Sequence, residues 1–126
     1  MTDRLLRALD NRHVDILGHP TGRRILQREP YPLDIEAVIA RAVQVGAALE
    51  INASAHRLDL NDVHARLARD RGARLVISSD SHSHRGFRVL RWGVLVARRA
   101  WLEPKHALNT LPFDRFKAAL RRNRRR

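Results

Sequence analysis

The sequence contains no cysteine, which excludes disulfide bonds and thiolate metal sites. Aromatic residues make up only 5% of the chain, so a folded core has to be built from aliphatic side chains. No run of about 18 apolar residues occurs, so no transmembrane helix is expected. The amino-terminal segment also lacks the apolar stretch of a secretory signal. These absences are typical of a cytoplasmic protein without a membrane segment.

What the chain has in excess is positive charge. Lysine and arginine number 25 against 13 acidic residues, a net charge of +12 over 126 residues. Such a balance favours polyanionic partners, nucleic acid first. Only Lys105 and Lys117 are lysines, and a bias toward arginine can also reflect codon composition. The charge therefore leaves two alternatives open, a DNA partner and a compositional bias.

Short apolar segments alternate with helical patterns in the first two thirds of the chain. The length suits one domain, residues 1–126, in which an amphipathic helix around Leu5 and Leu9 comes first. Strands are expected at 13–18, 48–52 and 74–79, and helices at 34–45 and 61–71. Strand–helix–strand order with helices of crossover length predicts an α/β fold with a parallel sheet.

The remaining third is less regular. A short helix is expected within 83–91, whereas 93–100 suits a strand or a helix, and its periodicity does not decide between them. A last helix is expected over 113–120, with Phe113, Phe116 and Leu120 on one face. The arginine-rich end, about 121–126, is expected to be a frayed basic tail.

Polar residues with ligand chemistry lie at the carboxyl ends of all three predicted strands. His19 follows the first, Glu50 and Asn52 lie at the end of the second, and Asp80 and His82 follow the third. Sites in parallel α/β folds form at the carboxyl ends of the strands, so we expect His19, Asp80 and His82 to converge. A carboxylate with imidazoles suits Zn²⁺, Mn²⁺ or Fe²⁺ better than Ca²⁺. The alternative is a surface turn that Asp80 caps and in which His82 is solvated.

Other polar residues at the same edge are candidates for supporting roles. Thr21, Gly22 and Arg23 follow His19, and Arg23 could contact a phosphate or be a solvated residue of an ordinary turn. Glu50 and Asn52 alternate with apolar residues of the second strand. They could orient metal ligands or make structural hydrogen bonds to the adjoining loops. Solvent-exposed positions are expected for the remaining histidines of the middle and carboxyl parts, His56, His64, His84 and His106.

The motifs resemble the polymerase-and-histidinol-phosphatase (PHP) family of metal-dependent phosphoesterases. The closest resemblance is to the PHP domain at the carboxyl end of bacterial family X DNA polymerases. Its motifs cover nearly the whole chain, and the stretches that carry the resemblance are DILGHPTGR (15–23), ALEINA (48–53), RLDL (57–60), LVISSDSH (75–82), WGVLVARRAWLEP (92–104) and LNTLP (108–112).

The resemblance implies a distorted seven-stranded β/α barrel with parallel strands, of which this chain is about the last half. The resemblance also implies a site for three divalent metals, with Mn²⁺ or Zn²⁺ expected and Mg²⁺ as the alternative. On this resemblance His19, Asp80 and His82 are metal ligands, and a metal-bound water is the nucleophile. Relatives in family X polymerases remove nucleotides from DNA 3′ ends. DNA is therefore the expected substrate, in a DNA repair role.

One departure from the family pattern limits these expectations. The family opens with a His-x-His motif and further His and Glu ligands, and none of these precedes His19 here. A missing amino-terminal half or a second copy of the chain would have to supply them. Two other functions stay open, an inactive basic nucleic-acid-binding remnant and a small-molecule phosphatase of the histidinol-phosphate kind. The resemblance implies a hydrolase, with a fragment that is inactive on its own as the alternative.

Overall fold

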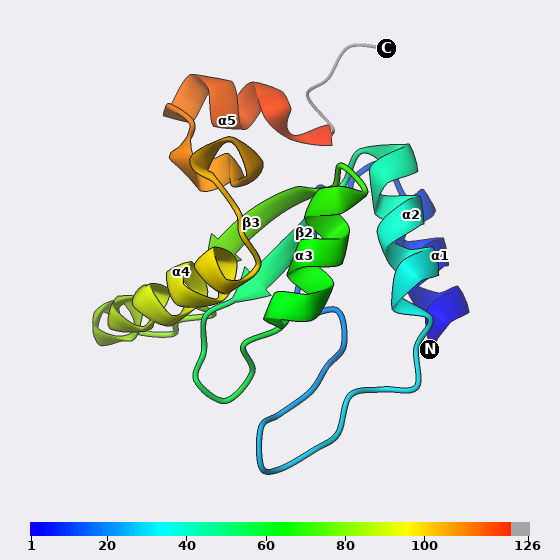
Figure 1. Ribbon diagram of the computed structural model, residues 1–126. Helices are drawn as coiled ribbons and strands as arrows, with labels where there is room; N and C mark the ends of the chain where they lie inside the picture. Colours follow the sequence, from blue (N-terminus) through cyan, green and yellow to red (C-terminus); the bar gives the residue numbers. More distant parts are fainter. Residues whose placement is uncertain (122–126) are drawn as a thin grey trace.

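The computed structural model describes residues 1–121, which form a parallel sheet with helices on both faces (Figure 1). The strands and α-helices are, in chain order, α1 (Thr2–Asp10), β1 (Ile16–Leu17), α2 (Ile35–Val45), β2 (Ala48–Asn52), α3 (Asp62–Asp70), β3 (Arg74–Ser78), α4 (Leu90–Arg99) and α5 (Phe113–Ala119). Short 3₁₀ turns lie at His84–Val89, Pro104–His106 and Leu108–Thr110. No helix within residues 1–121 is long and apolar enough to cross a membrane.

The sheet confirms the predicted α/β class. In the described part of the chain it has three strands in the order β1-β2-β3, all parallel. This arrangement is compatible with part of a β/α barrel. Strand β1 is shorter than expected, because Asn11 accepts hydrogen bonds from the backbone N–H groups of His13 and Val14 in a preceding turn. The central strand β2 is buried along its whole length.

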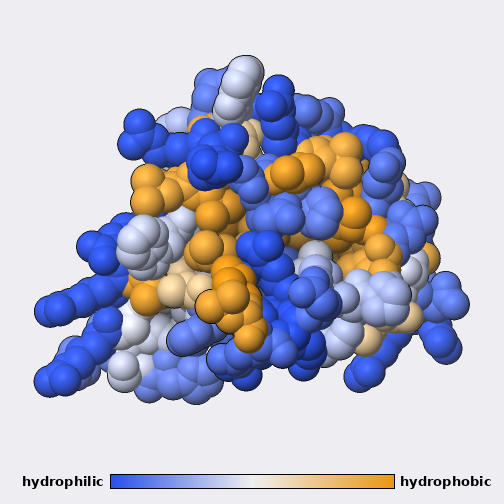
Figure 2. Space-filling view, turned by 60° about the horizontal axis from the view of Figure 1, so that its bottom comes forward, coloured by the Kyte–Doolittle hydropathy of each residue, from blue (hydrophilic) through white to orange (hydrophobic). Residues whose placement is uncertain are grey.

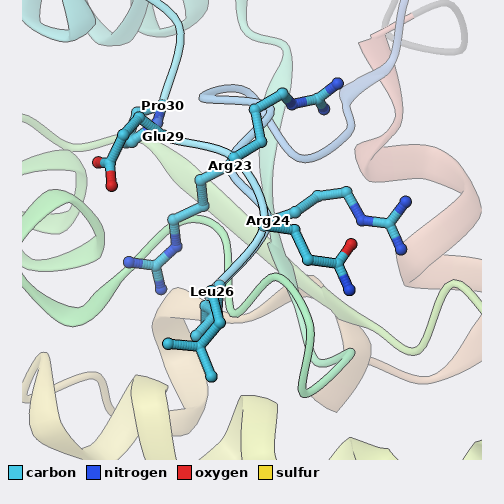
Figure 3. Close-up of a pocket in the computed structure, with 8 residues that line it drawn as sticks. Arg23, Arg24, Leu26, Glu29 and Pro30 are labelled. Atoms are coloured by element: carbon cyan, nitrogen blue, oxygen red, sulfur yellow. The ribbon is translucent and has the colours of Figure 1, made fainter.

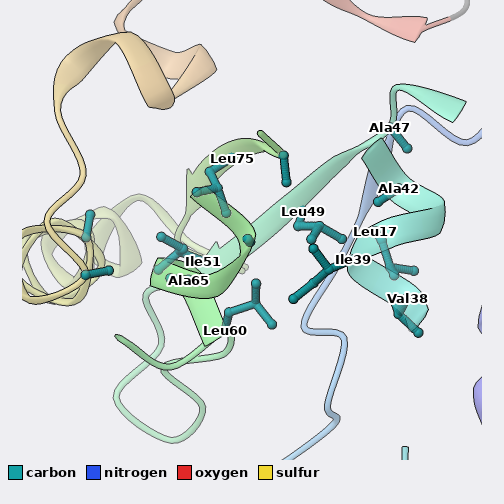
Figure 4. Packing of buried hydrophobic residues seen from close by; sticks show 14 of the residues in the cluster. Leu17, Val38, Ile39, Ala42, Ala47, Leu49, Ile51, Leu60, Ala65 and Leu75 are labelled. Carbon is teal, nitrogen blue, oxygen red and sulfur yellow. The ribbon is translucent and has the colours of Figure 1, made fainter. Parts of the chain in front are cut away.

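One face of the sheet carries the main core. Leu49 and Ile51 of β2 pack with Leu75 of β3 against Ile39 of α2 and Ala65 of α3 (Figure 4). Helix α1 lies beside α2 and adds Leu9, which is fully buried. The helices begin and end at the residues that favour these positions in sequence. Asp34 and Asn61 accept hydrogen bonds from Ala37 N and His64 N at the starts of α2 and α3, and Gly46 ends α2 with φ 73°.

The opposite face of the sheet is apolar at the amino ends of strands β2 and β3 and polar at their carboxyl ends. Ala48 and Val76 pack with Leu108, and α5 covers them through Phe116. Phe113, expected on one face with Phe116, is the first residue of α5 and is 75% exposed, whereas Phe116 packs against the sheet. Residues 122–126, most of the predicted basic tail, lie outside the described residues. Arg121 itself donates to the backbone carbonyls of Leu9 and Asn11.

The outer edge of β3 is closed by a side chain. Asn109 accepts a hydrogen bond from Ile77 N at 2.7 Å and donates one to Ile77 O at 2.8 Å. The amide thereby replaces a neighbouring strand, since it satisfies both backbone groups that an edge residue leaves unpaired. Residues next to it continue this contact through a parallel bridge between Leu75 and Ala107. Part of a barrel would be expected to have unpaired strand edges, but the edge of β3 at Ile77 is paired by Asn109.

The ambiguous segment 93–100 belongs to a helix, α4. It packs closely on the sheet through Gly93, where an added Cβ would stand 2.5 Å from Ile77 Cγ2 and 2.9 Å from Ala53 Cβ. A side chain at this position would push the helix off the sheet.

Replacing Gly93 by alanine tests this contact. In an exposed helix the change would stabilise by about 1 kcal/mol. Here we expect the free energy of unfolding to fall by about 1–3 kcal/mol, because the new methyl group overpacks the interface. Urea unfolding followed by circular dichroism measures it. The control is Val94→Ala at the next residue, 46% exposed, which should change little. A stabilised Gly93→Ala variant would contradict the packing described.

Candidate functional site

The carboxylate of Glu50 joins the carboxyl ends of the three strands. It accepts hydrogen bonds from His19 N at 2.5 Å, from Asn52 Nδ2 at 3.3 Å and from the hydroxyl of Ser78. Only 9% of Glu50 is exposed, so these donors replace the water that the carboxylate loses. Glu50 therefore fixes the backbone from which His19 projects. Gly18 leaves room for it, since a Cβ there would lie 3.4 Å from Glu50 Oε2.

Asn52, the second polar residue of β2, shapes the loop that follows. It is fully buried, and its Oδ1 accepts a hydrogen bond from Ser54 N at 3.0 Å. Its backbone N–H donates to Asp59 O, which brings the far end of the loop back to the strand. The observed contacts of Glu50 and Asn52 are thus structural hydrogen bonds to adjoining loops, one of the two alternatives. A further role toward a bound metal stays a prediction.

Asp59 is a central residue of this edge that sequence reasoning missed. It is 0% exposed, and its Oδ2 accepts hydrogen bonds from Thr21 N and Gly22 N, each at 3.0 Å. Burial raises the pKa of Asp59, and the hydrogen bonds from Thr21 and Gly22 and the charge of Arg23 oppose this rise. The only signal in the sequence is an acid between two leucines in RLDL.

Arg23 is held by the same loop. Its Nε donates to Arg57 O at 2.7 Å, and its Nη2 donates to Leu58 O. The guanidinium thus cross-links the segment after β1 to the segment after β2, which a solvated residue would not do. The predicted phosphate contact of Arg23 is not tested by this arrangement. Arg57 in turn places its Nε 3.6 Å from Asp80 Oδ2, so a positive charge faces one predicted metal ligand.

The predicted ligands themselves lie at strand ends in strained backbone. His19 has φ 29° and Asp80 has φ 54°, a region that residues other than glycine rarely adopt. Such strain is often found at functional positions. His82 Nδ1 lies 3.0 Å from Asp80 O. When Nδ1 donates this hydrogen bond, Nε2 is left as the nitrogen with a free lone pair for a ligand.

The structure places these residues at one edge but does not assemble a complete metal site from them. Within residues 1–121 no group of three or more His, Asp or Glu side chains is close enough to hold a metal ion. The residues present therefore do not by themselves fit the ligand set of a multi-metal centre, which needs more ligands than one histidine and an Asp-x-His pair.

The remaining histidines differ from one another in exposure. His56 and His84 are exposed, as expected. His64 was expected to be solvated, but its Nδ1 is buried, because α3 turns this side of the ring toward Asp59 and the core. Burial lowers the pKa of His64, and the charge of Asp59 opposes this. His106 is half-buried and accepts a hydrogen bond from Glu103 N at 2.9 Å.

Comparison with known proteins adds to this geometry. The chain is 42% identical over 120 residues to the DNA polymerase/3′-5′ exonuclease PolX of Bacillus subtilis, covering 95% of this chain and 21% of that protein. It is 38% identical over 87 residues to a probable phosphatase of Shewanella sp. strain ANA-3, covering 64% and 32%. A probable phosphatase of Caldanaerobacter subterraneus is 36% identical over the same length. The chain spans about a fifth to a third of these relatives, and no family model matches it.

Two substitutions at Asp59 separate its hydrogen bonds from its charge. Asp59→Ala removes the acceptor of two buried N–H groups, and we expect a loss of about 2–4 kcal/mol in the free energy of unfolding. Asp59→Asn keeps an oxygen in the same place and should cost much less at neutral pH. Chemical denaturation of both variants measures the difference. Equal losses would show that the hydrogen bonds to Thr21 and Gly22 do not matter.

The raised pKa of Asp59 also predicts a pH dependence. The folded chain holds this proton more tightly than the unfolded chain, whose value is near 3.8. The stability that Asp59 contributes is therefore fully present below pH 3.8 and is lost as the pH rises through the folded pKa. The unfolding free energy of the wild type minus that of Asp59→Asn should decline as the pH rises from 3.8 through the folded pKa of Asp59. A difference that grows with pH would contradict the sign of the shift.

Proposed function

We propose that the chain is a metal-dependent phosphoesterase unit acting on DNA 3′ ends. The proposal starts from the relationship of the chain to the carboxyl-terminal part of the PHP domain of family X DNA polymerases. The observation that carries the proposal is the strained backbone at two strand ends. His19 and Asp80, two of the predicted ligands, both have positive φ at the same edge of the sheet. Left-handed backbone also occurs at Leu58 and Trp101, so the support for the proposal comes from the coincidence of such backbone with ligand-type side chains at two strand ends.

In this proposal His19, Asp80 and His82 supply part of a ligand set for Mn²⁺ or Zn²⁺, and the other ligands come from outside the described residues. A preceding part of a PHP domain or a second copy of the chain would provide them. A bound divalent metal supplies Lewis acidity and a water activated near neutral pH. Glu50 orients the His19 backbone, and Arg57 places its Nε 3.6 Å from Asp80 Oδ2.

A second candidate is a small-molecule phosphatase, which is supported by the similarity to probable phosphatases of Shewanella and Caldanaerobacter. It would use the same ligands, and turnover of a phosphate monoester compared with turnover of a DNA 3′ end separates the two. A basic nucleic-acid-binding protein without catalysis is the third candidate, supported by the net charge of +12. Its DNA binding would depend steeply on salt and would survive His19→Ala.

The ligand assignment is tested by substitution. We expect His19→Ala, Asp80→Asn and His82→Ala each to weaken Mn²⁺ binding by about tenfold or more, because each removes a direct ligand. The control is His13→Ala, an exposed histidine before β1 whose loss should have no effect. Calorimetric titration of Mn²⁺ measures this for the chain alone and for an equimolar mixture with a PHP segment that carries the His-x-His motif.

Release of nucleotides from a 3′-labelled DNA, measured on the same mixtures, tests catalysis. Activity should appear only where all ligands are present, and each ligand variant should abolish it. Circular dichroism of each variant verifies folding. If His19→Ala and His13→Ala bind metal equally well, the ligand assignment is wrong. If a complete mixture binds metal and hydrolyses only phosphate monoesters, the DNA assignment is wrong.

A further inference from the structure

The loop that follows His19 carries an apolar side chain at its tip. Leu26 is 102% exposed, more than any other exposed large apolar residue of the described chain. It also has φ 61°, a left-handed conformation that is sterically unfavourable for leucine. Neither feature contributes to folding, since the side chain buries nothing and the backbone is strained. A residue that is unfavourable on both counts indicates a role in contact with another molecule.

The tip is held by a hydrogen-bonded hairpin, here called the Arg24–Arg28 hairpin. Arg24 N donates to Arg28 O at 2.9 Å, and Arg28 N donates to Arg24 O at 2.8 Å. Ile25 N donates to His56 O at 2.8 Å, which ties the hairpin to the loop after β2. Leu26 is therefore presented by a defined backbone, and contact with a ligand costs little further ordering of the loop.

The base of the hairpin is anchored beside the candidate site. The guanidinium of Arg28 donates twice to Gly22 O and lies 5.0 Å from the centre of the Tyr31 ring. Gly22 is itself held by Asp59, and the turn that contains it begins at His19 O. The hairpin thus stands on the same edge of the sheet as the predicted ligands, on the lower side of the molecule in Figure 1.

Positive charge surrounds the apolar tip. Residues 23–30 line a shallow hollow whose side chains include three arginines, Arg23, Arg24 and Arg28, against one acid, Glu29. Figure 3 shows Leu26 at the opposite end of the loop from Glu29 and Pro30, with Arg23 and Arg24 between them. Figure 2, in which this lower side comes forward, shows apolar areas interspersed with hydrophilic side chains.

We propose that the Arg24–Arg28 hairpin recognises the end of a DNA strand, with Leu26 packed on the exposed face of the terminal base and Arg24 on a backbone phosphate beside it. Inside a duplex every base face is covered by its neighbours, so an apolar tip that does not unstack the helix finds an open base face at a terminus. Apolar side chains are known to pack against unstacked base faces in this way. This inference rests on the proposed function and adds how the substrate end is selected.

The test compares two forms of one fluorescent duplex. One has open ends, and in the other both ends are capped by a non-nucleotide linker. We expect the full chain to bind the open duplex more tightly. Leu26→Asn, which tolerates the left-handed backbone, should lose about fivefold in affinity for the open duplex through loss of the apolar contact. Its affinity for the capped duplex should not change.

Three further variants complete the test. Leu26→Met keeps an apolar tip and should restore the preference for open ends. Val63→Asn, at a residue of α3 that is 67% exposed, is the matched control and should behave like the wild type. Arg24→Gln should weaken binding to both duplexes and reduce the slope of log affinity against log salt by about one.

The outcomes separate this inference from the proposed function. If the wild type prefers open ends and Leu26→Asn keeps that preference, the hairpin is not the end-recognition element and the proposed function stands. Equal binding of the wild type to both duplexes overturns the inference as well. If the chain binds neither duplex, both the inference and the DNA assignment fail. Leu26-dependent binding to lipid vesicles without an effect on DNA would assign the tip to a membrane surface and overturn the inference.

Discussion

A buried carboxylate has to be surrounded by hydrogen-bond donors, and in this protein the donors around Glu50 come from the ends of the sheet's three strands. His19 follows β1, Asn52 ends β2 and Ser78 ends β3. Because one side chain satisfies all three contacts, the strand ends cannot move independently without leaving a charge unpaired in the interior. The edge that carries the predicted ligands is thus held by a single residue of the central strand. The parallel order of the sheet makes this possible, since it brings the three carboxyl ends to one side.

A second set of contacts extends this order from the strands to the loops. Asp59 holds the turn after His19, and Arg23 reaches back from that turn to the carbonyls of Arg57 and Leu58. Arg57 then faces Asp80 from the next loop. The segments that follow β1, β2 and β3 are therefore connected in series by side chains whose polar groups are partly or fully buried. Such a connection explains how left-handed backbone at His19 and Asp80 is maintained in a domain of this size, because the surrounding contacts over-determine both positions.

The parts of the fold that periodicity and capping residues control were predictable, and the parts that long-range contacts control were not. Asp34 and Gly46 bound α2 as their chemistry predicts, and the alternation in β2 correctly paired Glu50 with Asn52 on one face. Segment 93–100 was ambiguous because GVLV suits either period, and its close packing on Ile77 is a tertiary effect. Asp59 was missed because an acid next to a predicted helix start reads as a surface residue. Only the distant N–H groups of Thr21 and Gly22 make it a buried acceptor.

The same distinction between local sequence patterns and long-range contacts holds for the candidate site. Residue types at strand ends sufficed to predict that His19 and Asp80 lie at one edge, but no local pattern could tell how many ligands that edge would hold. The described residues bring the right chemistry to the sheet edge and stop short of a complete ligand set. The contacts of Glu50, Asp59 and Arg23 maintain left-handed backbone at His19 and Asp80 within the chain itself. The edge is therefore ordered before any ligand binds, as the proposal of a larger centre completed from outside the described residues requires. Leu26 differs from these two positions, because its side chain is fully exposed and has no such contacts within the described chain, and the contact proposed for it lies outside the chain.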